Sequence, residues 1–197
     1  MFKKLFRPLY IPLFTFFNKL KYFILPNLLS KTKVKYETIP QFQQRTFITG
    51  KGSVYIGKNC AFGYKPGGFH FGGSIEIQAR TPESQIKIGS KVTTNNNIFI
   101  CSSGSIEIGD DTLIGQNVCI MDFEAHGVQP MDRRKVGETG FVRIEQNVWI
   151  GNNVTILKNT VISENSIIAA GAVVSGSFPS NVIIGGVPAK IIKHLDV

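Results

Sequence analysis

The chain has 197 residues, of which 43% are hydrophobic and 18% charged, and its formal net charge is +9. This length suits a single domain, and the hydrophobic fraction excludes a wholly disordered chain. A charge of +9 raises the question of nucleic-acid binding. However, residues 1–36 contain eight Lys or Arg and no Asp or Glu, so the remaining residues are close to neutral. Because the body has no basic stripe that could extend a footprint, no nucleic-acid partner is expected.

The first 36 residues also contain nine of the 21 aromatic residues. This composition is typical of a membrane-surface segment that contacts anionic lipid, or of an arm packed on a neighbouring subunit, and both readings stay open. The longest uncharged run, residues 8–18, is too short for a spanning helix, which needs ~18 residues or more. Lys19 and Lys21 follow it without a small-residue cleavage site, which argues against a signal peptide.

The chain has an odd number of cysteines, at positions 60, 101 and 119. Without secretion they are expected to be reduced thiols. The expected location is therefore the cytoplasm, with residues 1–36 as an address at the inner face of the cell membrane.

In the body an aliphatic residue recurs at every sixth position, in two stretches that share one phase: Ile108, Ile114, Ile120, Ile144, Ile150, Ile156, Ile162, Ile168 and Val174. A period of six predicts a short strand that ends in a tight turn, with three hexads forming one 18-residue triangular coil. Each aliphatic side chain would point to the coil axis and stack on its equivalent one coil later, about 4.8 Å away.

Turn-forming residues accompany the aliphatic ones: Asp111, Asn117, Asn147, Asn153, Asn159, Asn165 and Gly171, with further glycines at Gly109, Gly115 and Gly151. We expect them where the turns need a positive φ. Weaker hexads at Ile56, Ile88 and Ile100 have a different phase. Between them, residues 63–73 contain five Gly and one Pro, which predicts an irregular loop.

Residues 148–193, VWIGNNVTILKNTVISENSIIAAGAVVSGSFPSNVIIGGVPAKIIK, resemble the hexapeptide-repeat acyltransferases. Within that superfamily the chain is most similar to galactoside, maltose and polysaccharide-type sugar O-acetyltransferases, over about residues 85–193. The resemblance implies an all-β fold, a left-handed parallel β-helix. We expect a basic and aromatic, partly helical arm at 1–50, the β-helix at 51–185 with a loop at 121–143, and a short tail at 186–197.

The six-residue period is interrupted between Ile120 and Ile144. Counted on in steps of six, the positions there hold His126, Asp132 and Glu138 instead of aliphatic residues. A long polar excursion from a regular solenoid usually serves a site or an interface. His126 matches the position of the family's catalytic His, and a neutral imidazole suits a general base at neutral pH. The alternative is a solvated loop histidine. His70 and His194 are expected to be bystanders.

A histidine base needs a partner that fixes its tautomer. Asp122, four residues upstream, is the favoured partner, because the resembled enzymes carry Asp at that spacing. Glu124 or a backbone carbonyl could serve instead.

The resemblance also implies where acetyl-CoA, the expected co-substrate, would lie. The turn after Trp149 would supply an oxyanion donor, and backbone groups of Asn152 and Ala170, with Ser175 and Gly176 further along, would contact the pantetheine arm. The family usually has Lys at position 176, and Lys190 and Lys193 could supply that missing charge. Trp149 could equally anchor a subunit interface, and the two lysines could be solvated. Asn95, in a run of three Asn, matches a sugar-binding residue, or it simply forms a turn.

The sequence therefore predicts an acetyltransferase that moves acetyl from acetyl-CoA to a hydroxyl of a sugar or lipid-linked glycan precursor, with no metal. The resemblance implies a homotrimer with sites between subunits, and an amine acceptor would use the same chemistry. One alternative is a zinc enzyme like the γ-type carbonic anhydrases, which the wide spacing of the three histidines disfavours. Another is a β-helix binding or scaffold module without activity.

Overall fold

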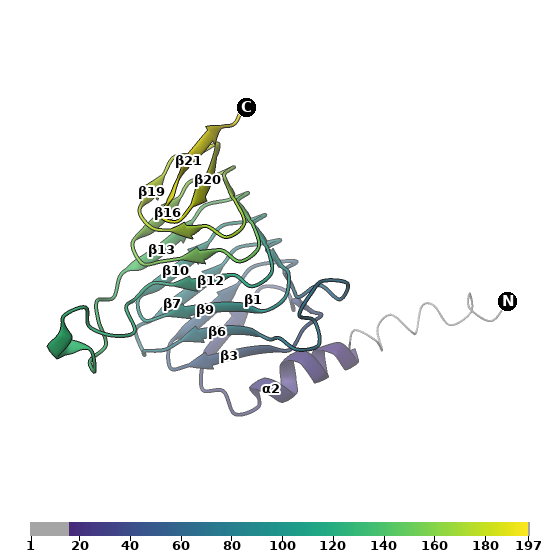
Figure 1. Ribbon diagram of the computed structural model, residues 1–197. Coiled ribbons are helices and arrows are strands. Elements are labelled where there is room, and N and C mark those ends of the chain that lie inside the picture. The colour runs from purple at the N-terminus through teal and green to yellow at the C-terminus, as the bar shows by residue number, and fades with distance from the viewer. Residues whose placement is uncertain (1–15, 197) are drawn as a thin grey trace.

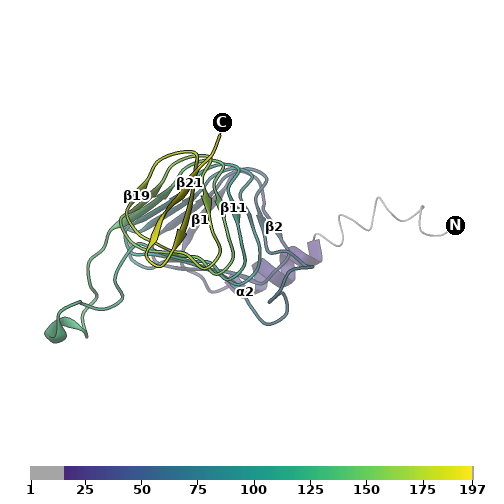
Figure 2. The ribbon, with the colours of Figure 1, turned by 45° about the horizontal axis from the view of Figure 1, so that its top comes forward.

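The computed structural model describes residues 16–196. They form one triangular β-helix whose coils stack in chain order from the N-terminal helix to the C-terminus (Figure 1). A view turned toward the helix axis shows the coils stacked on one another, with a long excursion leaving one side and the N-terminal helix on the other (Figure 2).

Three sheets form the walls over the described residues, and they are named A, B and C in the order in which each coil visits them. Sheet A contains β1 (Lys33–Tyr36), β4 (Ser53–Ile56), β7 (Gln85–Ile88), β10 (Ser105–Ile108), β13 (Phe141–Ile144), β16 (Thr160–Ile162) and β19 (Ser177–Phe178). Sheet B contains β2 (Gln41–Phe42), β5 (Ala61–Phe62), β8 (Thr93–Thr94), β11 (Leu113–Ile114), β14 (Trp149–Ile150), β17 (Ile167–Ile168), β20 (Val182–Gly186) and β21 (Ala189–His194). Sheet C contains β3 (Thr46–Gly50), β6 (Ile75–Ala79), β9 (Ile98–Ser102), β12 (Cys119–Met121), β15 (Thr155–Ile156) and β18 (Val173–Val174).

The six-residue period is confirmed as the register of the coil. All nine predicted aliphatic residues are at most 3% exposed and belong to one continuous core. Ile144 pairs with Ile162 and Ile156 pairs with Val174, each 18 residues later in the chain. The pairing is parallel throughout, except that β21 returns antiparallel to β20.

The turn residues divide into two groups with different physical reasons. The predicted Asp and Asn residues have φ between 55° and 60°, and Gly171 has φ +76°, as expected. Gly109, Gly115 and Gly151 are not in the positive-φ region. A Cβ on Gly109 would lie 2.5 Å from the Gln146 nitrogen, and one on Gly151 would lie 2.7 Å from the Ala170 nitrogen. These glycines are needed because stacked corners approach closely, so the positive-φ explanation was wrong for them.

The different phase of the early hexads comes from longer coils, since the side chains still point inward. Ile88 pairs with Ile108, 20 residues later, because the corner at residues 102–104 holds two extra residues. Ile56 pairs with Ile88, 32 residues later, because the irregular loop at 63–73 leaves the wall between them.

A short helix covers the N-terminal end of the β-helix. Helical residues from 16 onward continue into the π-helical turn η2 (Leu20–Ile24) and α2 (Leu25–Asn27). The Asn27 amide donates to the Thr46 carbonyl at 2.6 Å and accepts from the Ile48 N–H, so it satisfies backbone groups of edge strand β3. Phe23 stacks on Phe42 with ring centroids 4.3 Å apart. No helix within residues 16–196 is long and apolar enough to span a bilayer.

The expected segment boundaries lie inside these sheets. β1 to β3 pair with later strands, so the β-helix begins at Lys33 and not at residue 51. β21 pairs with β20, so residues 189–194 belong to sheet B and are not a separate tail. The part of the expected N-terminal arm at residues 1–15 lies outside the described residues.

Candidate functional site

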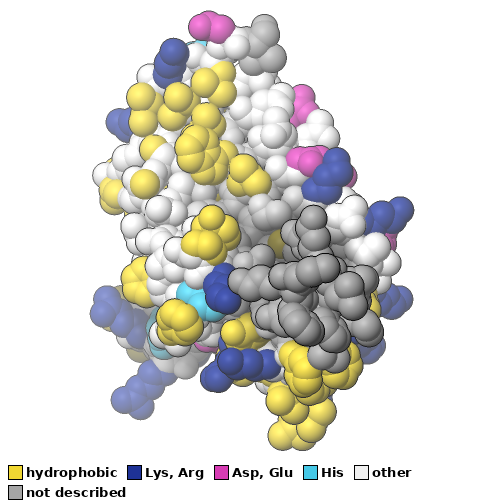
Figure 3. All heavy atoms as spheres, turned by 90° about the vertical axis from the view of Figure 1, so that its right-hand side faces the viewer, with side chains coloured by type: hydrophobic (Ala, Val, Ile, Leu, Met, Phe, Trp, Pro, Cys, Tyr) yellow, Lys and Arg dark blue, Asp and Glu magenta, His cyan; other side chains and the backbone are white. Residues whose placement is uncertain are grey.

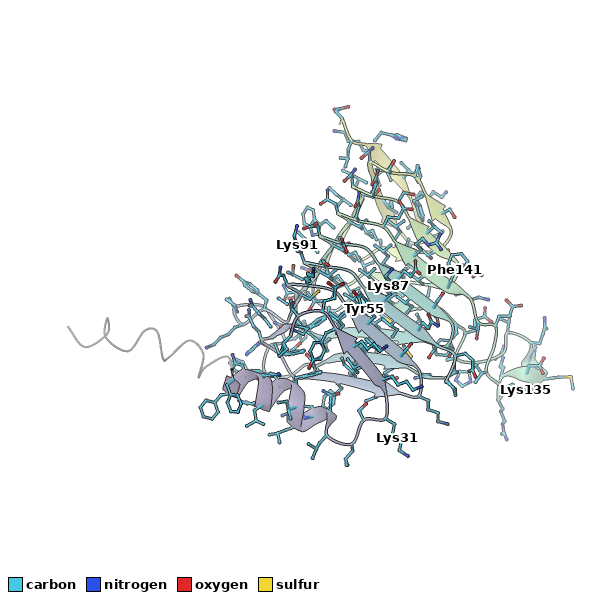
Figure 4. All side chains as sticks on the ribbon, turned by 180° about the vertical axis from the view of Figure 1, so that it is seen from behind. Lys31, Tyr55, Lys87, Lys91, Lys135 and Phe141 are labelled. Carbon is cyan, nitrogen blue, oxygen red and sulfur yellow. The ribbon has the colours of Figure 1, made fainter. Side chains whose placement is uncertain are left out.

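The excursion from the wall, residues 122–140, is an ordered two-stranded arm. Its two halves pair through backbone hydrogen bonds, from the Glu124 N–H to the Glu138 carbonyl at 2.9 Å and from the Gly127 N–H to the Lys135 carbonyl at 2.9 Å. A short 3-10 turn, η3 (Pro130–Asp132), forms the tip. The arm projects well clear of the coils, and Lys135 lies near its far end (Figure 4).

His126 lies on this arm with an exposed side chain. Its Nδ1 is 2.8 Å from the carbonyl oxygen of Arg133 in the opposite half of the arm. Since a carbonyl can only accept, Nδ1 carries the proton and Nε2 is left as the basic nitrogen. This arrangement fixes the tautomer that a general base requires.

Asp122 does not serve as the partner of His126. Its side chain is 0% exposed, and its carboxylate accepts hydrogen bonds from the corner of the preceding coil. These come from the Ser102 hydroxyl at 2.5 Å, the Ser103 N–H at 2.8 Å and the Gly104 N–H at 3.1 Å. Asp122 is the last residue before the chain leaves the wall, so its side chain faces inward to the corner. The backbone carbonyl, left open as an alternative, is the partner that the structure shows.

A hollow of about 410 Å³ on the outer face of sheet B brings together three of the expected site residues, Asn95, Trp149 and Asn152. Trp149 points out of β14 and is 55% exposed. Tyr64 and Gly115 also line the hollow. The arm leaves from the corner between sheets C and A, so His126 and this hollow occupy different sides of one chain.

The three consecutive Asn residues have three different roles. Asn95 lines the hollow. Asn96 is 0% exposed and holds the irregular loop, since its Nδ2 donates to the carbonyls of Tyr64 at 2.8 Å and Gly68 at 2.9 Å. Asn97 has φ +60° and forms the turn.

One backbone N–H group, that of Asn152, has no partner among the described residues and lies beside the hollow. In the turn after Trp149, the Gly151 and Asn153 N–H groups donate to carbonyls of neighbouring coils, which leaves that of Asn152. One coil earlier, the equivalent Gln116 N–H donates to the Asn152 Oδ1 at 2.9 Å. The residue that would cap Asn152 in the same way is Ala170, which has no side-chain acceptor. Sequence reasoning missed this signal, which is an Ala where the earlier coil has Asn.

The other expected cofactor residues fall into two groups. Lys190 and Lys193 are exposed on β21, at the end of the same sheet B that carries the hollow. Ser175 and Gly176 lie at the corner between sheets C and A, which is the corner from which the arm leaves. Within one chain they are therefore not on the face of Asn152 and Trp149.

The remaining histidines lie away from the arm. His70 is in the irregular loop and its ring makes an edge contact with Tyr22, while His194 is exposed at the end of β21. Over residues 16–196, no three His, Cys, Asp or Glu side chains are grouped as metal ligands would be.

Comparisons with known proteins agree on a family. The family described as bacterial transferase hexapeptide (six repeats) matches residues 141–176. A candidate lipopolysaccharide biosynthesis O-acetyl transferase of Escherichia coli strain K12 is 34% identical over 172 residues, which cover 82% of each chain. A galactoside O-acetyltransferase of Lactococcus lactis is 31% identical over 83% of this chain and 74% of the relative.

The fold of a solved structure, galactoside acetyltransferase in complex with coenzyme A, matches with a TM-score of 0.51 and 20% identity, over 94% of this chain and 82% of that one. This likeness confirms the left-handed parallel β-helix. The chain belongs to the hexapeptide-repeat transferase family and is an acetyltransferase of that family.

Proposed function

We propose that this protein transfers an acetyl group from acetyl-CoA to a hydroxyl of a sugar or glycan precursor, with His126 as general base. The observation that carries the proposal is the bond between His126 Nδ1 and the Arg133 carbonyl, because it leaves Nε2 as a base on an ordered arm. The names of the relatives support an O-linked sugar or polysaccharide acceptor.

The reaction needs one proton to move twice. Nε2 of His126 takes the acceptor's hydroxyl proton as the oxygen attacks the thioester carbonyl, and a C–O bond forms. The tetrahedral oxyanion accepts a hydrogen bond from the Asn152 N–H. When the C–S bond breaks, the CoA sulfur leaves and receives the proton from the imidazolium.

The site would be completed by a second subunit of a homotrimer, since His126 and the sheet B hollow are on different sides of one chain. The outward rows of the walls support this. On sheet B, Leu113, Trp149, Ile167 and Ile183 are aligned in register, whereas sheet A presents Lys87, Glu107 and Arg143 in register.

The tip of the arm is also apolar and exposed, with Val128 at 69%, Met131 at 93% and Val136 at 68% exposure. Exposed apolar groups of this kind are normally covered by a partner. An arm from one subunit laid over sheet B of the next would cover both surfaces and bring His126 to the hollow.

The donor would run along sheet B from the hollow toward the C-terminal end. β21, which carries Lys190 and Lys193, lies three strand spacings beyond β14, about 14 Å along the sheet. Lysine side chains there suit the phosphates of an extended acyl-CoA whose thioester lies beside Asn152. Ser175 and Gly176 would then contact the donor from the other subunit.

The test is release of free CoA thiol from acetyl-CoA with a panel of sugars and glycans, comparing wild type with the His126→Ala and His194→Ala variants. Loss of a general base should lower kcat by about 10²–10⁴-fold. His194 is exposed on β21 and should be replaceable without effect. Acceptor-dependent thiol release that survives His126→Ala would refute the mechanism, and zinc at one per subunit would favour the carbonic-anhydrase alternative.

We also propose that the N-terminal segment contacts anionic membrane. Five large apolar side chains of the described part are more than half exposed: Phe16, Phe17, Leu25, Leu28 and Leu29. Lys19, Lys21 and Lys31 are interspersed with them. Hydrophobic side chains gather at the lower end of the face drawn in Figure 3, with basic ones nearby. This combination suits an anionic lipid surface, where a lipid-linked acceptor would be found.

A further inference from the structure

The arm that carries His126 is tied to the coil below by one lysine. Lys158 Nζ lies 3.0 Å from Glu124 Oε1 and 2.7 Å from Glu138 Oε2. Lys158 belongs to the corner between β15 and β16, directly under the base of the arm, where the neighbouring Asn159 N–H donates to the Phe141 carbonyl at 2.7 Å. The two carboxylates come from opposite halves of the arm, so a single ammonium joins both halves to the body.

The contacts of Lys158 with Glu124 and Glu138, called the clamp below, differ in burial and in number of partners from the other ion pairs of the described residues. Lys91 and Asp111 form a single pair with side chains 64% and 51% exposed, and such pairs contribute little. The Lys158 side chain is only 19% exposed and has two carboxylate partners, of which Glu124 is 30% and Glu138 83% exposed. Without the ammonium, Glu124 and Glu138, which are cross-strand neighbours, would repel one another.

The charge states agree with this geometry. The hydrogen bonds that the Lys158 ammonium donates to Glu138 and Glu124 raise its pKa above the ordinary value of 10.5. The bond that Glu138 accepts from Lys158 lowers the pKa of that carboxyl below 4.5. The lowered carboxyl pKa means that the contribution of Glu138 is lost only in acid, and the raised ammonium pKa means that the contribution of Lys158 is lost only in alkali. Lys158 and Glu138 therefore both stay charged across the neutral range.

The clamp lies between the base of the arm and the catalytic segment. Glu124 is two residues before His126, and beyond it follow the Gly127 N–H bond to Lys135 and the His126 bond to the Arg133 carbonyl. The angle at which the arm leaves the coil is thus fixed at Glu124 and Glu138. A rotation of the arm at this point would move the imidazole of His126 relative to the coils.

We propose that Lys158 is a positioning residue for acetyl transfer, which holds the arm at the angle that delivers His126 to the neighbouring subunit's hollow. The proposal rests on the proposed function of His126. Lys158 does not contact the reacting groups, and its effect is on kcat, since a misplacement of about 1 Å can cost about 10²-fold in rate.

The test compares Lys158→Met, which keeps the stem and removes the charge, with Lys158→Arg, which keeps the charge, and with Lys91→Met as matched control. We expect Lys158→Met to lower kcat at least tenfold with KM for acetyl-CoA within about twofold, and Lys158→Arg to recover most of kcat. Hydrogen exchange of residues 123–140 should be faster in Lys158→Met, and the trimer should persist.

Wild-type kcat in Lys158→Met, or a loss of kcat that Lys91→Met shares, would overturn the proposal. If Lys158→Met does not fold, the double variant Glu124→Gln/Glu138→Gln is measured instead. It removes both ion pairs but keeps the lysine side chain, and it must show the same loss of kcat. His126→Ala separates the two proposals. If it abolishes transfer while Lys158→Met and the double variant do not lower kcat, the clamp proposal alone fails, and if it leaves transfer intact, the proposed function fails.

Discussion

The Asp122 carboxylate accepts the Ser103 N–H at 2.8 Å across one coil step, and this contact closes the wide corner from which the arm leaves. This corner holds two residues more than the corresponding corners of the later coils. Its Ser103 and Gly104 N–H groups donate to the Asp122 carboxylate and not to a strand of the neighbouring coil. Because the Asp122 carbonyl also accepts the Gly140 N–H at 2.7 Å, the same residue joins the two ends of the arm.

Asp122→Ala should therefore destabilise the protein by about 2–4 kcal/mol, since it leaves two partly buried N–H groups and the buried Ser102 hydroxyl without their acceptor. Asp122→Asn keeps one acceptor oxygen and should cost less. Urea unfolding of the protein measures both, with Asp196→Ala, at an exposed site near the C-terminus, as a control expected within about 0.5 kcal/mol of wild type. An unchanged unfolding midpoint for Asp122→Ala would contradict the structural role.

The period of six predicts the fold so well because it is a local signal repeated many times. The side chains of Ile144, Ile150 and Ile156 all point to the coil axis, and a shift of the register by one residue would turn them all outward. The phase shift at Ile88 and Ile100 has no local signal. It depends on two extra corner residues, whose N–H groups are bound by the side chain of Asp122, about 20 residues later in the chain.

Which residues belong to the candidate site could be predicted from the sequence better than the contacts that those residues make. His126 and Trp149 stand out as the loop histidine and the single tryptophan, and the structure places both at exposed positions. The partner of His126 was not predictable, because a carbonyl leaves no mark on the sequence and because spacing cannot show that Asp122 faces into the wall. Lys158 gave no signal either, since its carboxylate partners are 20 and 34 residues away.

Ala170 leads to a prediction about the oxyanion donor. In Ala170→Asn the new side-chain oxygen should cap the Asn152 N–H as Asn152 caps that of Gln116, and kcat should fall by about 10²–10³-fold with the fold intact. Ala170→Leu has the same number and branching of side-chain heavy atoms as Asn but no acceptor, so it separates loss of the donor from obstruction. Equal kcat values for the two variants would assign the effect to bulk alone.

A shared site predicts complementation between two inactive variants. His126→Ala lacks the base, and Asn95→Trp should fill the hollow. When the two proteins are mixed, unfolded together and refolded at equal concentration, about one quarter of the sites in random trimers should combine an intact arm with an intact hollow. Thiol release near a quarter of wild type is therefore expected, and a mixture as inactive as its components would place the whole site within one chain.

The cysteines should be unreactive in the folded protein. Burial raises the pKa of the Cys101 thiol to about 11, and burial likewise raises the pKa of Cys60 and of Cys119. At pH 8 only about one Cys101 in a thousand is then a thiolate, the form that alkylates. Iodoacetamide labelling read by peptide mass spectrometry should mark Cys119, which is partly exposed, before Cys60 or Cys101, and all three in urea. Rapid labelling of Cys101 in the native protein would contradict the burial described here.

The N-terminal segment gives the last prediction, which separates its two possible partners. The full chain should sediment with vesicles that contain anionic lipid and much less with neutral ones, and rising salt should weaken the binding because the attraction of lysines to the surface is screened. Leu28→Asp/Leu29→Asp should abolish binding, whereas Val187→Asp, at an equally exposed apolar residue near the C-terminus, should not. If the double variant instead lowers the oligomeric state and leaves vesicle binding unchanged, the exposed helix face packs on a neighbouring subunit and does not contact the membrane.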